Sequence, residues 1–270
     1  MKTNNMRNFL KTGLMVLTVF CATGCNACDK VKAEEATGEE EISSGEKSSG
    51  ENLAKDISTS GSNPIQIHFD GSIAPNEFDP NSDRCKMSFN RFPNTKEEFL
   101  DLREKIGTTP EGSALLFLMS MELYRRNKSA GEQCVNLMIT EGNHYDVLGY
   151  KLPELFRSSD KYYGRPYQVA GMLQGTSPEK GYNLTPPYKF EVMTLKDNYR
   201  EVNMGGKGHQ VKMYIVQPSG VKSTTGNPSI VFVRVPATPS ARKYFIGSDV
   251  GAYLKNVEDK DVDRQFNGLK

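Results

Sequence analysis

The sequence contains no tryptophan and almost no imbalance of charge. Of its 270 residues, 34 are lysine or arginine and 33 are aspartate or glutamate, so the formal net charge is +1 at pH 7. A chain this close to neutral has no overall field that would favour nucleic acid or an anionic membrane, and we expect no nucleic-acid partner. The missing tryptophan removes a residue that often anchors interfaces, although 12 tyrosines and 13 phenylalanines remain.

Motifs of several enzyme and metal-site classes are also missing. There is no HExxH motif, no GxSxG elbow and no CxxC spacing beyond the N-terminal region. The glycine-rich run at residues 205–208 lacks the spacing and the ending of a P-loop, and it fits a turn between strands. The run from Asp79 to Asp83 begins like a calcium loop, but Arg84 stands where that loop needs glycine and Asn90 where it needs glutamate. We therefore predict neither a cofactor nor a metal site.

Residues 1–24 have the layout of a secretory signal peptide. The basic residues Lys2, Arg7 and Lys11 precede a short apolar run at residues 13–20. That run is too short to hold the chain in a bilayer as a permanent span, which favours a cleaved signal.

Residues 22–25 read Ala-Thr-Gly-Cys and resemble the lipobox of bacterial lipoproteins, which usually reads Leu-Ala-Gly-Cys. The resemblance implies cleavage before Cys25, a diacylglycerol thioether on its thiol, and a location outside the cytoplasm on the cell membrane or outer membrane. Ala22 departs from the usual leucine, and an ordinary cleaved signal peptide is the alternative. Cys21 and Cys28 are poorer lipidation sites, because a phenylalanine directly precedes the first and an asparagine lies two residues before the second.

Residues 25–63 form a polar, acidic segment. Runs such as Glu-Glu-Ala-Thr-Gly-Glu-Glu-Glu contain almost no large apolar side chains. Such a segment cannot bury enough apolar surface to offset the entropy lost on ordering. We predict a disordered tether that lifts a domain off the membrane, and consider a cation-binding tail a weaker alternative. Residues 64–270 are predicted to form one globular domain.

The first half of this domain favours helices. Residues 65–69 alternate between apolar and polar and predict a strand, which is followed by a loop to about residue 90. A capping box at residues 95–98 opens a helix, and Thr109 followed by proline opens a second, whose apolar run predicts a buried central helix. A second capping box at residues 129–132 predicts the start of a third helix.

The second half favours strands. A brief helix is also expected at residues 250–254. Helices before strands favour an α+β fold, in which an N-terminal group of about three helices packs on a mostly antiparallel sheet formed by the C-terminal half. The strand patterns lie at residues 167–173, 188–192, 211–215, 230–235 and 242–246.

Over roughly residues 92–262 the chain resembles an uncharacterised domain of bacterial exported proteins. The likeness rests on Thr-Thr-Pro-Glu-Gly at residues 108–112, Gly-Thr-Ser-Pro-Glu-Lys-Gly-Tyr at 175–182 and Pro-Pro-Tyr at 186–188. Lys180 replaces the asparagine that is usual in this family. The resemblance implies a shared fold and a single domain, and it carries no activity.

Cys85 and Cys134 are the two cysteines of the predicted domain. In an exported protein they are candidates for a disulfide bond. A catalytic pair of Cys134 and His144 is the alternative. It is less favoured, because Cys134 falls on the inward face of its predicted helix and a buried thiol is seldom a nucleophile. The other histidines, His68 and His209, are far apart in sequence.

A tyrosine-rich loop is the best binding-site candidate in the sequence. Rigid loops that carry tyrosine serve in glycan and protein recognition, but we favour the simpler interpretation that these rings pack between helices and sheet. The candidate residues are Pro178, Gly181, Tyr182 and Tyr188.

The function that these features favour is a lipid-anchored bacterial envelope protein without enzymatic activity, which binds an envelope protein or polymer. The alternative is a surface-exposed hydrolase or thiol enzyme that uses Cys134 or a histidine. A third hypothesis is an inhibitor-like module that masks another protein.

Overall fold

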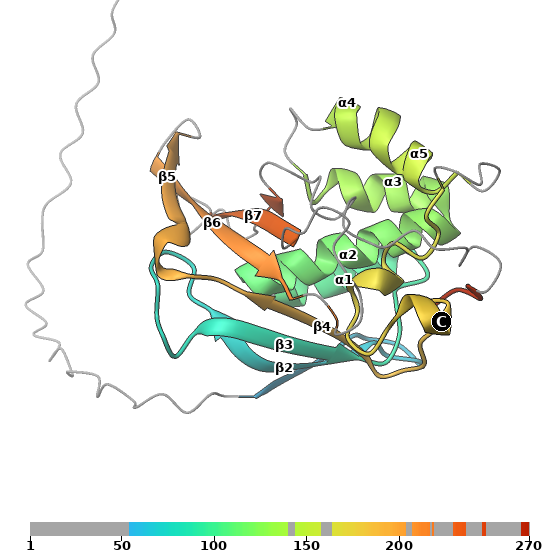
Figure 1. Ribbon diagram of the computed structural model, residues 1–270, viewed down its shortest axis with the longest axis horizontal. Coiled ribbons are helices and arrows are strands. Elements are labelled where there is room, and N and C mark those ends of the chain that lie inside the picture. Colours follow the sequence, from blue (N-terminus) through green and yellow to red (C-terminus); the bar gives the residue numbers. More distant parts are fainter. Residues whose placement is uncertain are drawn as a thin grey trace, which may run out of the picture. The chain divides into compact units, whose positions relative to one another are not determined.

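The structure is a computed structural model (Figure 1), which describes residues 54–139, 144–157, 164–203, 207–216, 218, 229–235, 245–246 and 266–269. For residues 144, 201–203, 207–209, 229–235 and 245–246 only the backbone is described. The predicted signal peptide, Cys25, most of the predicted tether and the helix expected at residues 250–254 lie outside these ranges.

The described strands form one antiparallel sheet. Its order is β1-β2-β3-β4-β6-β7-β8, and β5 pairs with the far end of β6. Every strand pairing between described residues is antiparallel, as predicted. The strands are β1 (Lys55–Ser58), β2 (Gln66–Ile73), β3 (Asp83–Phe89), β4 (Tyr188–Met193), β5 (Tyr199–Asn203), β6 (Lys207–Ile215), β7 (Ser229–Val235) and β8 (Phe245–Ile246).

Three of these strands precede the helices, so the prediction that the C-terminal half forms the sheet is wrong. Strand β1 lies in the segment predicted to be tether, and β3 lies in the segment predicted to be a loop. The residues of β3 alternate, with Cys85, Met87 and Phe89 buried and the residues between them more exposed. Pairing with β4, from Arg84 opposite Met193 to Phe89 opposite Tyr188, joins the two halves of the chain.

The folded part also begins earlier than the predicted boundary at residue 64. Strand β1 pairs with β2 and lies inside the segment expected to be tether. Beyond β1, the backbone N–H of Ile65 donates to the Thr59 hydroxyl at 2.6 Å, and that of Ser60 donates to the Asp101 carboxylate at 2.8 Å. This polar segment is ordered by hydrogen bonds to its partner strand, and Ile57 packs against the core.

The three predicted helices are confirmed as α1 (Lys96–Ile106), α2 (Pro110–Arg126) and α3 (Lys128–Asn136). Thr95 and Thr109 cap the first two through their hydroxyls, as their sequence positions predict. The cap of α3 is Asn127 and not the expected Ser129, because Asn127 also ends α2 and the chain turns there at once.

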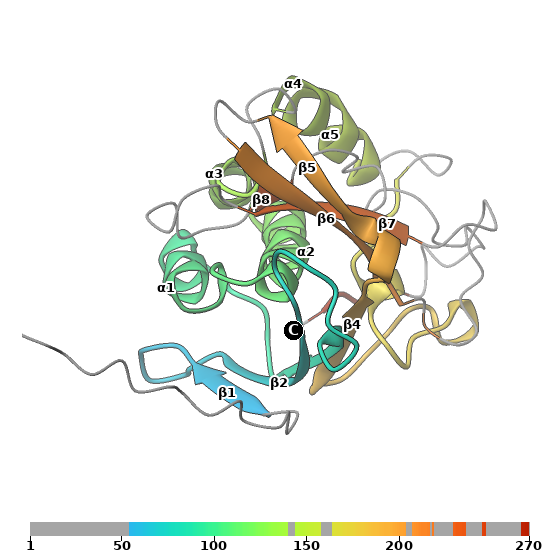
Figure 2. The same ribbon diagram turned by 90° about the vertical axis from the view of Figure 1, so that its left-hand side faces the viewer.

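Helix α2 forms the centre of the core, as predicted. Its residues are buried continuously from Pro110 to Tyr124. Figures 1 and 2 show α1 and α2 together on one face of the sheet, above β1–β3, with α3 beside α2. None of the helices among the described residues is long and apolar enough to cross a bilayer.

The strand predicted at residues 167–173 is wrong. This segment forms turns and a short 3-10 helix, Ala170–Met172, in which the Gly171 N–H donates to the carbonyl of Tyr167 at 2.9 Å. The segment is buried on all sides, so its sequence has no alternation of polar and apolar residues that would distinguish a helix or turn from a strand. A short apolar run is compatible with a buried turn as well as with a strand.

The other predicted strands appear as β4, β6, β7 and β8, whereas β5 was not predicted. The remaining helical elements are short. They are α4 (His144–Asp146), a π-helical turn (Val147–Lys151), α5 (Leu152–Leu155) and two 3-10 turns (Pro178–Lys180 and Lys196–Asn198).

Candidate functional site

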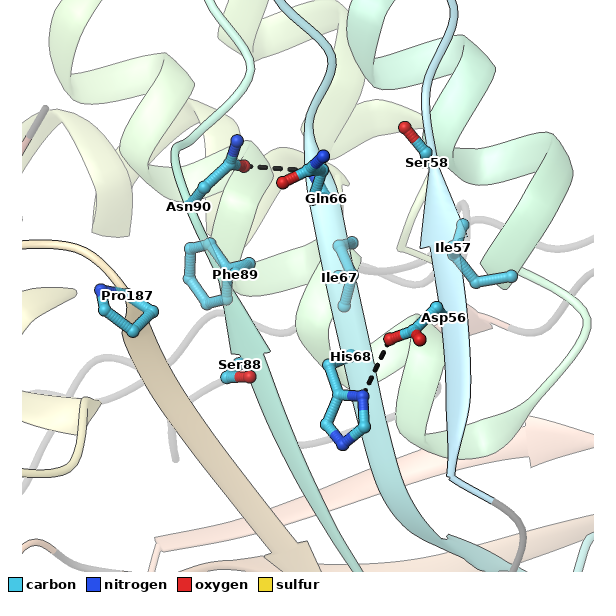
Figure 3. A pocket seen from close by; sticks show the side chains of 10 residues that line it. All are labelled: Asp56, Ile57, Ser58, Gln66, Ile67, His68, Ser88, Phe89, Asn90 and Pro187. Carbon is cyan, nitrogen blue, oxygen red and sulfur yellow. Dashed lines mark hydrogen bonds and ion pairs between the residues drawn. The ribbon is translucent and has the colours of Figure 1, made fainter.

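A groove lined by both polar and apolar residues runs across the face of β1–β3 that is turned away from the helices (Figure 3). We call it the outer groove. Its volume is about 490 Å³, which is within the range of small-ligand sites. Its walls are formed by Asp56, Ile57, Ser58, Gln66, Ile67, His68, Ser88, Phe89, Asn90 and Pro187.

Strand alternation places the polar members of this set on one face. In β2 the side chains of Ile67 and Phe69 are buried against the helices, whereas Gln66 and His68 are exposed. The strand register then sets Asp56 opposite His68 and His68 opposite Ser88, which gives a row of three polar residues across three strands.

The side chains of His68 and Asp56 are hydrogen-bonded in the groove. His68 Nδ1 lies 2.7 Å from Asp56 Oδ1, and the two side chains are 45% and 86% exposed. A pair this exposed to water contributes little to stability. Its structural effect is to orient the imidazole, whose Nε2 meets no hydrogen-bonding partner among the described residues (Figure 3).

Asn90 fixes the end of the groove where β2 begins. Its Oδ1 accepts from the Gln66 N–H at 2.9 Å, and its Nδ2 donates to the Pro64 carbonyl at 3.0 Å. The side-chain amide of Gln66 and the hydroxyl of Ser88 bond to no other described residue. The groove therefore presents neutral donors and acceptors beside the hydrogen-bonded pair of His68 and Asp56.

A second hollow of about 230 Å³ continues the outer groove toward β4 and shares His68 and Ser88 with it. Its charged walls carry two acidic and two basic residues: Asp70, Glu191, Lys86 and Lys189. Glu191 is also paired with Arg84 across β3 and β4. Neither sign of charge dominates this face. A ligand there would be held by hydrogen bonds and not by a strong electrostatic field.

The predicted disulfide is not formed, since Cys85 and Cys134 are both free and buried. Cys85 lies on β3 near Glu111, whereas Cys134 lies on α3 near Lys96. The two thiols therefore have different charged neighbours. Burial raises the pKa of both thiols, that of Cys134 to about 12. Thiols held in this neutral form are poor nucleophiles.

The predicted tyrosine-rich loop packs inside the domain, which agrees with the packing interpretation. Tyr182 and Tyr188 are buried, and the Tyr182 ring stacks on that of Tyr167 with centroids 4.7 Å apart. Pro178 is buried too, and Gly181 takes the left-handed conformation, with φ of 60°, that the turn requires. These rings are therefore not available to a ligand.

The remaining sequence candidates contribute no site. The side chains of His144 and His209 lie outside the described residues, so the structure does not test the Cys134–His144 pair. In the calcium-like run, Asp79 accepts from the Asn81 N–H at 2.9 Å and forms the turn between β2 and β3. No group of metal-ligating side chains is gathered among the residues that the structure describes.

Sequence reasoning missed the outer groove because two of its three strands were assigned to loop and tether. The available signal was the alternation in residues 84–89. The register that aligns Asp56, His68 and Ser88 has no signature in any one of the three strands.

A family model described as a domain of unknown function, DUF6935, matches residues 91–258. The chain belongs to the DUF6935 family. The matched DUF6935 segment begins after β3, so the residues of the outer groove other than Pro187 precede it. No curated protein and no solved structure matches the chain.

Proposed function

We propose that the protein is a lipid-anchored component of the bacterial cell envelope whose domain binds a hydroxyl-rich envelope polymer in the outer groove. The anchor part of the proposal rests on the lipobox-like residues 22–25 behind a signal-like leader. The binding part rests on one observation, which is the row of polar side chains with unused hydrogen-bonding groups across β1–β3.

The chemistry of the groove supports a neutral, hydroxylated ligand. Asp56 and His68 are hydrogen-bonded to one another, so each already has a partner within the groove. The free Gln66 amide and Ser88 hydroxyl each offer both a donor and an acceptor. Sugar hydroxyls have the same dual character, and a polymer of them matches a groove that is open at its surface.

The segment between anchor and domain supports a role at a distance from the membrane. If residues 26–53 behave as a flexible polar chain, their root-mean-square span is roughly 30 Å. Such a tether lets the domain sample polymer above the membrane surface without leaving it.

The anchor is tested by substitution of Cys25 in the full-length chain, expressed in bacteria that are fed a palmitate analogue suitable for click labelling. Cys25→Ala should abolish the label and release the protein from the membrane fraction, because one thioether-linked lipid supplies the attachment. Cys28→Ala is the matched control and should retain both. Unchanged labelling of Cys25→Ala would refute the anchor.

The ligand is tested by co-sedimentation of the purified full-length protein with isolated cell-wall glycan. Gln66→Ala combined with Ser88→Ala should weaken binding roughly tenfold or more, at about 1 kcal/mol for each lost hydrogen bond. Lys128→Ala, on the exposed end of α3, is the control and should bind as the parent does. Equal sedimentation of all three proteins would show that the groove does not bind this polymer.

The same row favours a second proposal, a hydrolase with Ser88 as nucleophile. Asp56 bonds to Nδ1 of His68, which is the nitrogen that an orienting carboxylate holds in serine hydrolases. No hydrogen bond joins His68 to Ser88, and such contacts often close only when substrate binds. A fluorophosphonate probe should label the parent and not Ser88→Ala, with Ser58→Ala as control. An unlabelled parent chain eliminates this second proposal.

A further inference from the structure

Glu111 is a buried carboxyl group with one oxygen unused. It lies in the first turn of α2, is 5% exposed, and its Oε2 has no hydrogen-bonding partner among the described residues. A buried oxygen without a partner costs roughly 1–3 kcal/mol, and more when it is charged. Few such atoms persist in a folded protein without a ligand, water or ion to meet them.

A cavity adjoins this carboxyl group, on the side of the sheet opposite to the outer groove. We call it the Glu111 cavity; its volume is about 210 Å³. It lies where β1 and β2 meet the end of α1 and the start of α2, a junction that Figure 2 shows. Ile57, Phe69 and Ile106 supply apolar walls, and Lys55 and Lys105 supply positive charge.

The two lysines differ in their partners. Lys105 donates to the Ser58 carbonyl at 2.8 Å and to the Asp101 carboxylate at 3.1 Å, so its charge is already compensated. Lys55 is exposed and pairs with no described residue, although its charge acts on Glu111. The cavity thus combines one cation without a hydrogen-bonding partner among the described residues, one carboxyl group and an apolar wall between strand and helix.

We propose that the Glu111 cavity binds a small zwitterion of the amino-acid class, with its ammonium group on Glu111 Oε2 and its carboxylate at Lys55. The aliphatic side chain of the ligand lies against Ile57, Phe69 and Ile106. This assignment goes beyond polymer binding in the outer groove and shares only Ile57 with that groove.

Size and charge together select this class. The volume is below the roughly 300 Å³ at which pockets for drug-sized ligands begin, so the ligand is compact. A simple anion gains Lys55 but meets the carboxyl group of Glu111. A simple amine gains Glu111 but faces Lys55. A molecule that carries both charges satisfies both residues and remains neutral overall, as the site is when Glu111 is ionised.

Protonation of Glu111 should control this binding, since only the carboxylate accepts an ammonium group without a competing proton. Burial raises the pKa of Glu111 to about 7, and hydrogen bonds and Lys55 oppose that rise. Besides Lys55 and Lys105, the titratable groups near Glu111 are Cys85 on β3 and Tyr199 on β5, and both have raised pKa values and stay neutral near pH 7. Affinity should therefore fall about tenfold per pH unit below pH 7.

The test is calorimetric titration of the full-length protein at pH 8 with both enantiomers of leucine and with two analogues that each lack one charged group. These analogues are 3-methylbutylamine, which lacks the carboxylate, and 4-methylpentanoate, which lacks the ammonium group. One leucine enantiomer should bind at least tenfold more tightly than either analogue. Glu111→Gln should weaken this binding by tenfold or more, and Lys55→Met should remove the preference for leucine over the amine.

Two further measurements keep the outcome decisive. Lys128→Ala, far from the cavity, should bind leucine as the parent does, and thermal melting should show that each variant is folded. If Glu111→Gln fails to fold, the Lys55→Met result and the pH dependence of the parent decide. Tighter binding of 4-methylpentanoate than of leucine, or no heat with any of the probes, overturns the proposal.

Discussion

At the scale of the residue, Glu111 should make stability depend on pH. Its pKa is raised from 4.5 to about 7 by burial, so the folded state holds a proton that the unfolded chain releases. The stability present below pH 4.5 is therefore lost progressively as pH rises to 7, by about 3 kcal/mol in total. Urea unfolding at pH 5 and pH 8 measures this loss.

The matched variant is Glu111→Gln, which retains the shape of the side chain and cannot ionise. We expect its free energy of unfolding to change much less between pH 5 and pH 8 than that of the parent. Equal pH dependence in the two proteins would assign the effect to other groups and would place Glu111 in contact with water.

At the scale of the element, α2 and α3 approach so closely that one glycine sets their spacing. A Cβ on Gly131 would lie 2.0 Å from Cα of Tyr124, inside the backbone of α2. No side-chain rotation relieves such a contact, so Gly131→Ala should destabilise the fold by about 3 kcal/mol or more. Chemical denaturation measures this cost.

Ser129→Ala is the control for this variant. Ser129 is exposed and does not cap α3, so this substitution should change the free energy of unfolding by less than about 0.5 kcal/mol. A well-folded Gly131→Ala variant of parental stability would contradict the close packing.

At the scale of the whole molecule, the folding unit is longer than the matched family segment. The match begins at residue 91, whereas β3 pairs with β4 along its length and carries Phe89, whose ring lies 5.0 Å from that of Phe92. A fragment of residues 91–270 should therefore expose the edge of β4 and aggregate, because an unpaired strand edge is a template for association. A fragment of residues 54–270 should melt cooperatively in a calorimeter. A soluble and cooperatively melting shorter fragment would show that β1–β3 are an addition to the domain and not part of it.

Local signals explain the parts of the fold that could be predicted. The hydroxyls of Thr95 and Thr109, a proline at the first helical position and the apolar run of α2 act within a few residues, so their structural effect is visible in the chain itself. Strand β4 and the described part of β6 can likewise be predicted from the alternation of their own residues. Strand β1 cannot be predicted in this way, because its order depends on pairing with β2.

The sequence alone determined the positions of α1, α2 and α3, the burial of α2 and the α+β class, since capping and periodicity are properties of neighbouring residues. Only the tertiary structure decided which residues share a site. Asp56, His68 and Ser88 meet through the register of three strands. Burial beneath β1 and β2 raises the pKa of Glu111, so that this carboxyl group titrates near neutral pH. Both depend on contacts between residues distant in the chain, and the spacing of residues along a sequence does not record such contacts.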